Sequence, residues 1–199
     1  MPVNAIADRY RRHADSFERT VAAARPDQWN DPSPCAKWTA RDVVDHVIMM
    51  HGAMLTPLDR TLTPPPADAL GAFRAARADV TALLDDPEAA ATECRTPTGT
   101  MTAAQHVDQV LTDDLILHGW DLAMALGRDA TMDQAEVERL WAANTAVPAE
   151  TMAQFRTPGA FGPGIEVFGP EVPVDASASL QDRLLGFIGR DPRWTRRSP

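Results

Sequence analysis

The amino-acid sequence predicts an all-α protein, a four-helix bundle with an extra short C-terminal helix. Long segments carry apolar residues at the spacing of an α-helix, breaks rich in Pro and Gly separate these segments, and the alternating pattern of strands is nearly absent. A chain of 199 residues of which 44% are hydrophobic is long enough to bury one sizeable core. We therefore expect the long helices to pack their apolar stripes around a single core.

The first two helices have recognisable start and stop signals. Apolar side chains recur every three or four positions over residues 3–24, and Pro26 marks the end of this segment. A second helix begins after Thr39, because a threonine can cap a helix and Asp42, three residues later, can return the bond. Prolines at residues 64–66 end any continuation of this second helix.

The next part of the chain contains the longest predicted helix. A shorter helix is expected over residues 67–86, and it leads to a turn at residues 96–100. The longest helix then covers about residues 102–126 and ends at Gly127, a residue type that suits the left-handed position after a helix.

The last part of the chain combines helices with a loop. Thr131 is expected to cap a helix that extends to residue 155, and Pro148 should kink or divide that helix. Residues 157–176 are rich in Gly and Pro and are interpreted as an extended covering loop. A final short helix is expected over residues 177–190.

This order of segments predicts a single domain made of two parts. Residues 1–156 form the helical bundle, and residues 157–199 form a C-terminal extension that packs on the bundle. The sequence contains no internal repeat and no low-complexity tract.

Charge and cysteine content restrict the partners and the compartment. The formal net charge of −9 disfavours a nucleic acid or an anionic membrane, because both repel an acidic protein. No segment approaches the roughly 20 apolar residues that cross a bilayer. The N-terminus lacks the apolar stretch of a signal peptide, and two cysteines are too few for a disulfide scaffold. We expect a cytoplasmic protein, a monomer or a homodimer, that acts on a small molecule.

Three polar residues interrupt an apolar helix face in the segment DDLILHGWDL, residues 113–122. At about 100° per residue, Asp114, His118 and Asp121 lie in one narrow arc together with core-facing apolar residues. A dry carboxylate costs several kcal/mol unless a partner compensates for its charge. A divalent metal is such a partner, because a carboxylate and an imidazole four residues apart can bind one ion.

A third metal ligand is expected from a facing helix. His46 lies at the edge of the apolar arc of the second helix, so we predict the ligand set His46, Asp114 and His118. Two imidazoles and one carboxylate leave a coordination position for water or a substrate, as in catalytic metal sites. Asp121, one turn after His118, is interpreted as the acceptor that holds an imidazole N–H rather than as a fourth ligand.

Structural explanations compete with the metal hypothesis. Asp114 and His118 also fit a simple ion pair within one helix. Cys35 is a candidate ligand or reactive thiol, but we favour the interpretation that it is a small buried residue packed beneath Trp38. The remaining histidines are interpreted as residues at the edge of the core, namely His13, His51 and His106.

Three segments resemble a known family. They are PCAKWTARDVVDHV (34–47), DDLILHGWDLAMALG (113–127) and DRLLGFIGRDPRW (182–194), which resemble the actinobacterial branch of the DinB-like helical bundles. That branch includes the mycothiol-dependent maleylpyruvate isomerases. The resemblance spans almost the whole chain and implies a DinB-like four-helix bundle of unusual connectivity. It also implies a divalent metal, often zinc, held by His46, Asp114 and His118.

Two features depart from the isomerases that the sequence resembles. The acidic ligand of those enzymes is usually Glu, whereas Asp114 stands here and has a shorter reach. Those enzymes also have a separate C-terminal domain with an essential arginine, and this chain is too short for a full version of that domain. Its tail offers Arg190 instead, which is a candidate catalytic residue or a cap of the last helix, and Asp121 is the other catalytic candidate.

The function expected from this resemblance is metal-dependent thiol chemistry. A low-molecular-weight thiol such as mycothiol would bind at the open metal position as a thiolate and attack a small electrophile, giving isomerisation or thiol transfer. The loop from Phe161 to Phe168 would form a partial lid. The residues leave two alternatives open: a metal-activated hydrolase or Fe(II) enzyme without a thiol, and a non-catalytic metal-binding or ligand-binding bundle. Zinc, nickel, manganese and iron all suit the donor set.

Overall fold

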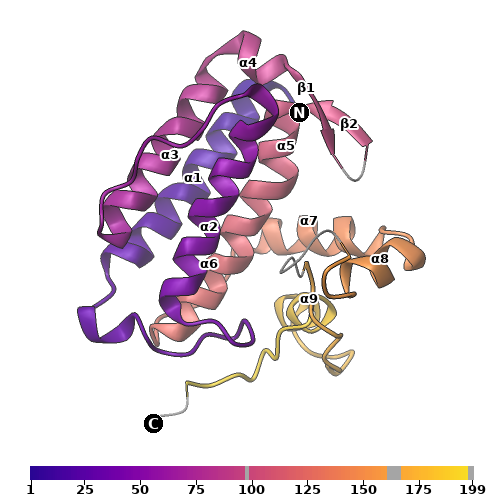
Figure 1. Cartoon of the computed structure of the whole chain (residues 1–199). Helices are drawn as coiled ribbons and strands as arrows, with labels where there is room; N and C mark the ends of the chain where they lie inside the picture. Colours follow the sequence, from indigo (N-terminus) through magenta and orange to yellow (C-terminus); the bar gives the residue numbers. More distant parts are fainter. Residues whose placement is uncertain (97–98, 161–166, 197–199) are drawn as a thin grey trace. The chain divides into compact units, whose positions relative to one another are not determined.

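Helices make up nearly all of the regular structure in this computed structural model, which describes residues 1–96, 99–160 and 167–196 (Figure 1). The predicted all-α class is confirmed. The chain divides into two compact units, Met1–Ala130 and Thr131–Pro199. The sequence analysis placed the boundary between the bundle and the C-terminal extension after residue 156, which differs from the boundary of these two units. The extension beginning at residue 157 stays a prediction. None of the helices described is long and apolar enough to cross a membrane.

The first unit is the predicted four-helix bundle. Its long helical segments are α1 (Val3–Ala22), α2 (Ala40–Leu55), α3 (Ala69–Asp85) and the continuous run of α5 (Ala103–His106), η3 (Val107–Thr112) and α6 (Asp113–Ala125). Helices α1 and α2 each pack on both α3 and α6. Consecutive helices α1 and α2 therefore occupy opposite corners of the bundle. Apolar side chains from all four segments fill the core, among them Tyr10, Phe17, Val47, Phe73, Leu83, Leu111 and Leu122.

The predicted start of α2 is confirmed. The Thr39 hydroxyl accepts a hydrogen bond from the Asp42 backbone N–H at 3.2 Å, and the Asp42 carboxylate accepts one from the Thr39 N–H at 2.8 Å. This reciprocal cap satisfies two backbone donors at the helix N-terminus. It fixes where α2 begins, and hence the face on which His46 lies, one turn after Asp42.

The predicted long helix at residues 102–126 is continuous but not regular. It contains a π-helical turn, η3, between the α-helical parts α5 and α6. The spacing of apolar residues in the sequence did not reveal this turn, because the apolar residues of the turn still point into the core. Gly127 follows α6 with φ 65°, which confirms the predicted left-handed position.

Short elements connect the long helices of the first unit. They are η1 (Pro26–Gln28), η2 (Thr56–Leu58), α4 (Pro87–Ala91) and the antiparallel hairpin of β1 (Glu93–Thr96) and β2 (Gly99–Thr102). The sequence predicted only a turn at residues 96–100. The two strands were missed because four residues each are too few to establish an alternating pattern.

The second unit contains α7 (Gln134–Thr145), α8 (Ala149–Phe155) and α9 (Leu180–Phe187). Pro148 separates α7 from α8, as predicted. The predicted cap Thr131 is wrong: α7 starts later in the chain, where the Asp133 carboxylate accepts a hydrogen bond from the Glu136 N–H at 3.1 Å. Residues 161–166 of the predicted covering loop and lid lie outside the described residues.

His51 lies inside the core rather than at its edge. The ring is 0% exposed, with its Nδ1 2.7 Å from the Val47 carbonyl oxygen and its Nε2 2.9 Å from the Tyr10 hydroxyl. The phenyl ring of Phe73 meets its ring edge on, with centroids 5.5 Å apart. Burial lowers the pKa of His51 to about 4, although the Val47 carbonyl opposes this shift.

We predict that His51 makes the fold sensitive to acid. The unfolded chain binds a proton at His51 near its ordinary pKa, whereas the folded chain binds one only near pH 4, so stability is full above that ordinary pKa and falls as the pH drops. In chelator-treated protein, His51→Gln should remove about 2 kcal/mol of the stability loss between pH 7 and pH 5. Urea unfolding at both pH values measures this difference. His13→Gln is the control, and equal losses in wild type and His51→Gln would contradict the prediction.

Candidate metal centre

Three side chains from two packed helices of the first unit meet at one point. His46 comes from α2, and Asp114 and His118 come from successive turns of α6. One nitrogen or oxygen of each residue lies within 4.8 Å of the others. The Asp114 Oδ1 atom is 3.4 Å from His46 Nε2 and 3.3 Å from His118 Nε2. The structure thus brings together the three residues that the sequence singled out.

This spacing suits a shared divalent cation. Two ligand atoms that bind a tetrahedral zinc ion at about 2 Å lie roughly 3.4 Å from each other. The Asp114 Oδ1 atom has this separation from both imidazole nitrogens. Two imidazoles and one carboxylate are also a common donor set of catalytic metal sites, which keep a further position open.

The second oxygen of Asp114 supports the same interpretation. Asp114 Oδ2 is buried and has no hydrogen-bond partner among the described residues. A buried carboxylate oxygen without a partner is costly, and each such atom in a folded protein calls for an explanation. A cation bound at this cluster would supply the missing partner.

Asp121 fixes the orientation of the His118 ring. The Asp121 side chain is 0% exposed, and its Oδ2 accepts a hydrogen bond from His118 Nδ1 at 2.9 Å. When the His118 ring is neutral, the proton on Nδ1 leaves the lone pair on Nε2, which is the atom that faces Asp114. The predicted contact between Asp121 and His118 is therefore present, while a catalytic role for Asp121 stays a prediction.

Charges within the cluster stabilise one another. Burial raises the pKa of Asp114, but His118 and His46 outweigh burial and hold that pKa well below its usual range. Burial lowers the pKa of His118, but Asp114 and Asp121 outweigh burial and raise that pKa to about 9. In the metal-free protein, a protonated His118 therefore pairs with an ionised Asp114 at neutral pH.

Trp38 covers the two imidazoles and was not predicted as part of the site. Its ring centroid lies 4.8 Å from that of His46 and 5.5 Å from that of His118, with an angle of only 24° between the planes of Trp38 and His118. The sequence signal was an aromatic residue directly before the capping Thr39. The sequence pattern suggested only that Trp38 covers Cys35, whereas its ring packs against both imidazoles.

Among the described residues, the cluster includes neither Cys35 nor the remaining histidines. Arg190 belongs to the second unit, where it is 8% exposed and its Nη1 lies 3.5 Å from the Ile188 carbonyl oxygen. Its catalytic role, like that of Asp121, stays a prediction. The other candidates of the first unit are half-buried, namely His13, Cys35 and His106.

Comparisons with known proteins identify one family model and two relatives of similar length. A sequence model of the mycothiol maleylpyruvate isomerase N-terminal domain matches residues 10–74. Two curated relatives from Mycobacterium tuberculosis, uncharacterized protein MT0763 of strain CDC 1551 / Oshkosh and uncharacterized protein Rv0738 of strain ATCC 25618 / H37Rv, are each 30% identical over 187 residues. Each match covers 92% of this chain and 97% of the relative.

A solved structure has the same fold. The crystal structure of a mutant of the mycothiol-dependent maleylpyruvate isomerase superimposes with a TM-score of 0.51. The match covers 80% of this chain and 75% of that protein, at 18% sequence identity. At this identity the likeness is evidence for the fold alone.

We predict that Asp121 contributes to the high pKa of His118. Asp121→Asn keeps the shape of the side chain but removes its charge, so the His118 pKa in chelator-treated protein should fall by about one unit or more. NMR titration of the imidazole signals measures this pKa. Asp45→Asn removes an exposed carboxylate that pairs with Arg41 on α2 and is the matched control. An unchanged His118 pKa in Asp121→Asn would show that Asp121 has no such role.

Proposed function

We propose that this chain, which belongs to the DinB-like family of the mycothiol maleylpyruvate isomerase N-terminal domain, is a metal-dependent enzyme that uses a low-molecular-weight thiol. Its expected reaction is isomerisation of a small electrophile or transfer of the thiol to it. The single observation that supports this proposal best is the convergence of His46, Asp114 and His118 around a buried carboxylate oxygen without a partner. Family membership supports the thiol as the second reactant.

Each residue of the cluster has a distinct task in this proposal. His46 and His118 offer their Nε2 atoms and Asp114 its carboxylate as ligands. A divalent ion held there would lower the pKa of a thiol at its open position and so provide a thiolate at neutral pH. Asp121 holds the proton on His118 Nδ1, and Trp38 keeps water from one side of the two imidazoles.

The first prediction from this proposal concerns the metal. Purified protein should bind one equivalent of Zn²⁺, and His46→Ala and His118→Ala should each lower the affinity by roughly 100-fold. Affinity should rise from pH 6 to pH 9, because the metal must displace a proton from His118, whose pKa is about 9 in the metal-free protein.

Elemental analysis and competition with a coloured chelator measure the stoichiometry and the affinity. His106→Ala is the matched control, because His106 lies before the π-helical turn of the same helical run and outside the cluster. Substoichiometric metal in the wild type, or wild-type affinity in His118→Ala, would refute the metal site.

The second prediction concerns the thiol. Mycothiol at about 100 times its dissociation constant should stabilise the zinc-loaded protein by about 2.7 kcal/mol, because only the folded form binds it. Thermal shift measurements detect this as a rise in Tm. Zinc-free protein and His118→Ala should show no rise, and the disulfide form of mycothiol, which has no free thiol, is the ligand control. Tight zinc binding without any thiol effect would favour water activation or a non-catalytic bundle instead.

A further inference from the structure

A π-helical turn directly precedes the proposed ligand Asp114, and we propose that Arg9 of α1 positions this ligand by holding that turn in place. The inference rests on the proposed metal site and adds a residue that does not itself touch the metal. Segments of π-helix are rare and occur mainly as single turns inside α-helices, frequently at functional sites. In this chain the turn is η3, residues 107–112, and α6 begins at its end.

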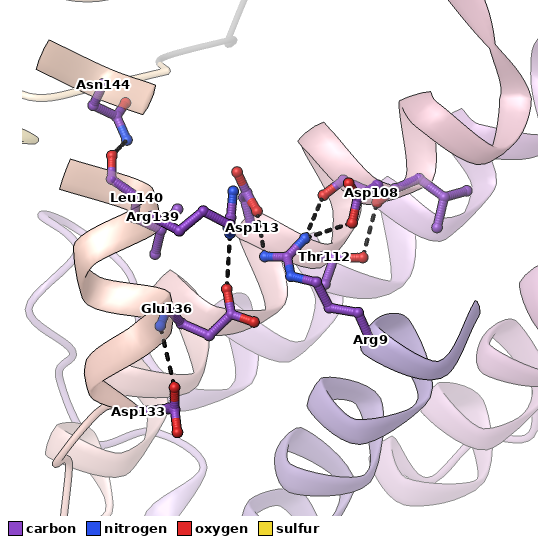
Figure 2. Close-up of polar contacts among 10 residues, drawn as sticks. Arg9, Asp108, Thr112, Asp113, Asp133, Glu136, Arg139, Leu140 and Asn144 are labelled. Atoms are coloured by element: carbon purple, nitrogen blue, oxygen red, sulfur yellow. Dashed lines mark hydrogen bonds and ion pairs between the residues drawn. The ribbon is translucent and has the colours of Figure 1, made fainter. Parts of the chain in front are cut away.

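Arg9 forms a buried fork between the two ends of η3 (Figure 2). Its Nη1 donates to the Asp108 carboxylate at 2.6 Å and to the Asp108 backbone carbonyl at 3.0 Å. Its Nη2 donates to the Asp113 carboxylate at 2.8 Å. The Arg9 side chain is 4% exposed, and those of Asp108 and Asp113 are 17% and 18% exposed. Limited exposure makes these ion pairs stronger than ordinary surface pairs.

The spacing of the two carboxylates links Arg9 to the π geometry. Asp108 and Asp113 are five residues apart, and in a regular α-helix such residues are rotated by about 140° from each other. A π-helical turn bonds residues five apart, so it brings them close to the same side of the helix. The single planar guanidinium of Arg9 can therefore pair with both carboxylates while η3 keeps its wide turn.

A buried hydroxyl supports the same turn from within. The Thr112 side chain is 0% exposed, and its hydroxyl donates to the Val107 carbonyl oxygen, five residues earlier, at 3.0 Å. This bond helps to satisfy a carbonyl inside the π-helical turn (Figure 2). Arg9 and Thr112 thus stabilise η3 through different groups, which allows two independent tests.

The geometry of α6 explains why this turn matters to the metal site. Asp113 pairs with Arg9 of α1, and the next residue, Asp114, faces His46 of α2. If η3 became a regular α-helical turn, α5 and α6 would rotate relative to each other by about 100°, the rotation of one residue. Arg9 would then lose one of its carboxylates, or Asp114 and His118 would turn away from His46.

The test compares full-length variants at this turn with a matched variant elsewhere on α1. Arg9→Met removes the fork, Arg9→Lys keeps the charge without the planar fork, and Thr112→Val removes only the hydroxyl. Arg11→Met is the control, because Arg11 lies on the same helix and pairs with Asp8 and Asp85. Readouts are Zn²⁺ affinity, the visible absorption spectrum of bound Co²⁺, and hydrogen exchange of the backbone amides of residues 107–114.

We expect Arg9→Met to lower Zn²⁺ affinity about ten-fold or more, to change the Co²⁺ spectrum and to speed amide exchange over residues 107–114. Arg9→Lys and Thr112→Val should change all three readouts in the same direction but less. Arg11→Met should leave all three at wild-type values. A folded Arg9→Met with wild-type affinity, spectrum and exchange would overturn the inference.

Two further outcomes are also decisive. If Arg9→Met does not fold, Thr112→Val and Arg9→Lys replace it, and wild-type readouts in both would overturn the inference. If wild-type protein binds neither Zn²⁺ nor Co²⁺, the proposed metal function fails. Amide exchange then still decides whether Arg9 holds η3: faster exchange in Arg9→Met but not in Arg11→Met supports this role, and equal exchange in both refutes it.

Discussion

The burial of one carboxylate between two imidazoles is the constraint on which the candidate site depends. Burial raises the pKa of Asp114, and His46 and His118 outweigh this effect, so the two imidazoles keep the carboxylate ionised in this position. Its second oxygen has no hydrogen-bond partner among the described residues, so the pairing is incomplete. In the metal-free state this arrangement stabilises a protonated His118. Its nitrogen and oxygen atoms could instead bind a metal cation, which would replace that proton.

Several other residues hold His46 and His118 in position beside Asp114. The reciprocal cap at Thr39 sets the start of α2, the hydrogen bond from His118 to Asp121 fixes one ring, and Trp38 covers both rings. Helices α2 and α6 pack directly on each other, so both halves of the cluster stand on rigid elements rather than on loops. Such support is what holds ligand atoms within a few tenths of an ångström of a useful geometry.

The sequence predicted the bundle and the three clustered residues, but not the features that depend on particular tertiary contacts. His46, Asp114 and His118 were identifiable because polar residues on an apolar face break a strong periodic pattern. The π-helical turn was not predicted because it adds only one residue to the helix and its apolar side chains still pack on the core. Trp38 escaped because a stacking partner is set by how two helices pack, which no local pattern encodes. The predicted cap Thr131 was wrong because Asp133, two residues later, caps α7, and both residue types cap helices well.

The placement of α1 and α2 at opposite corners of the bundle also constrains the biogenesis of the protein. The cluster is carried by α2, which precedes α3 in the sequence, and by α6, which follows it. These two helices become neighbours only when they pack on each other in the bundle. A nascent chain emerging from the ribosome cannot assemble the cluster before α6 has been synthesised. Capture of a cation at this cluster would accordingly be a late event, coupled to closure of the bundle rather than to the folding of any one hairpin of helices.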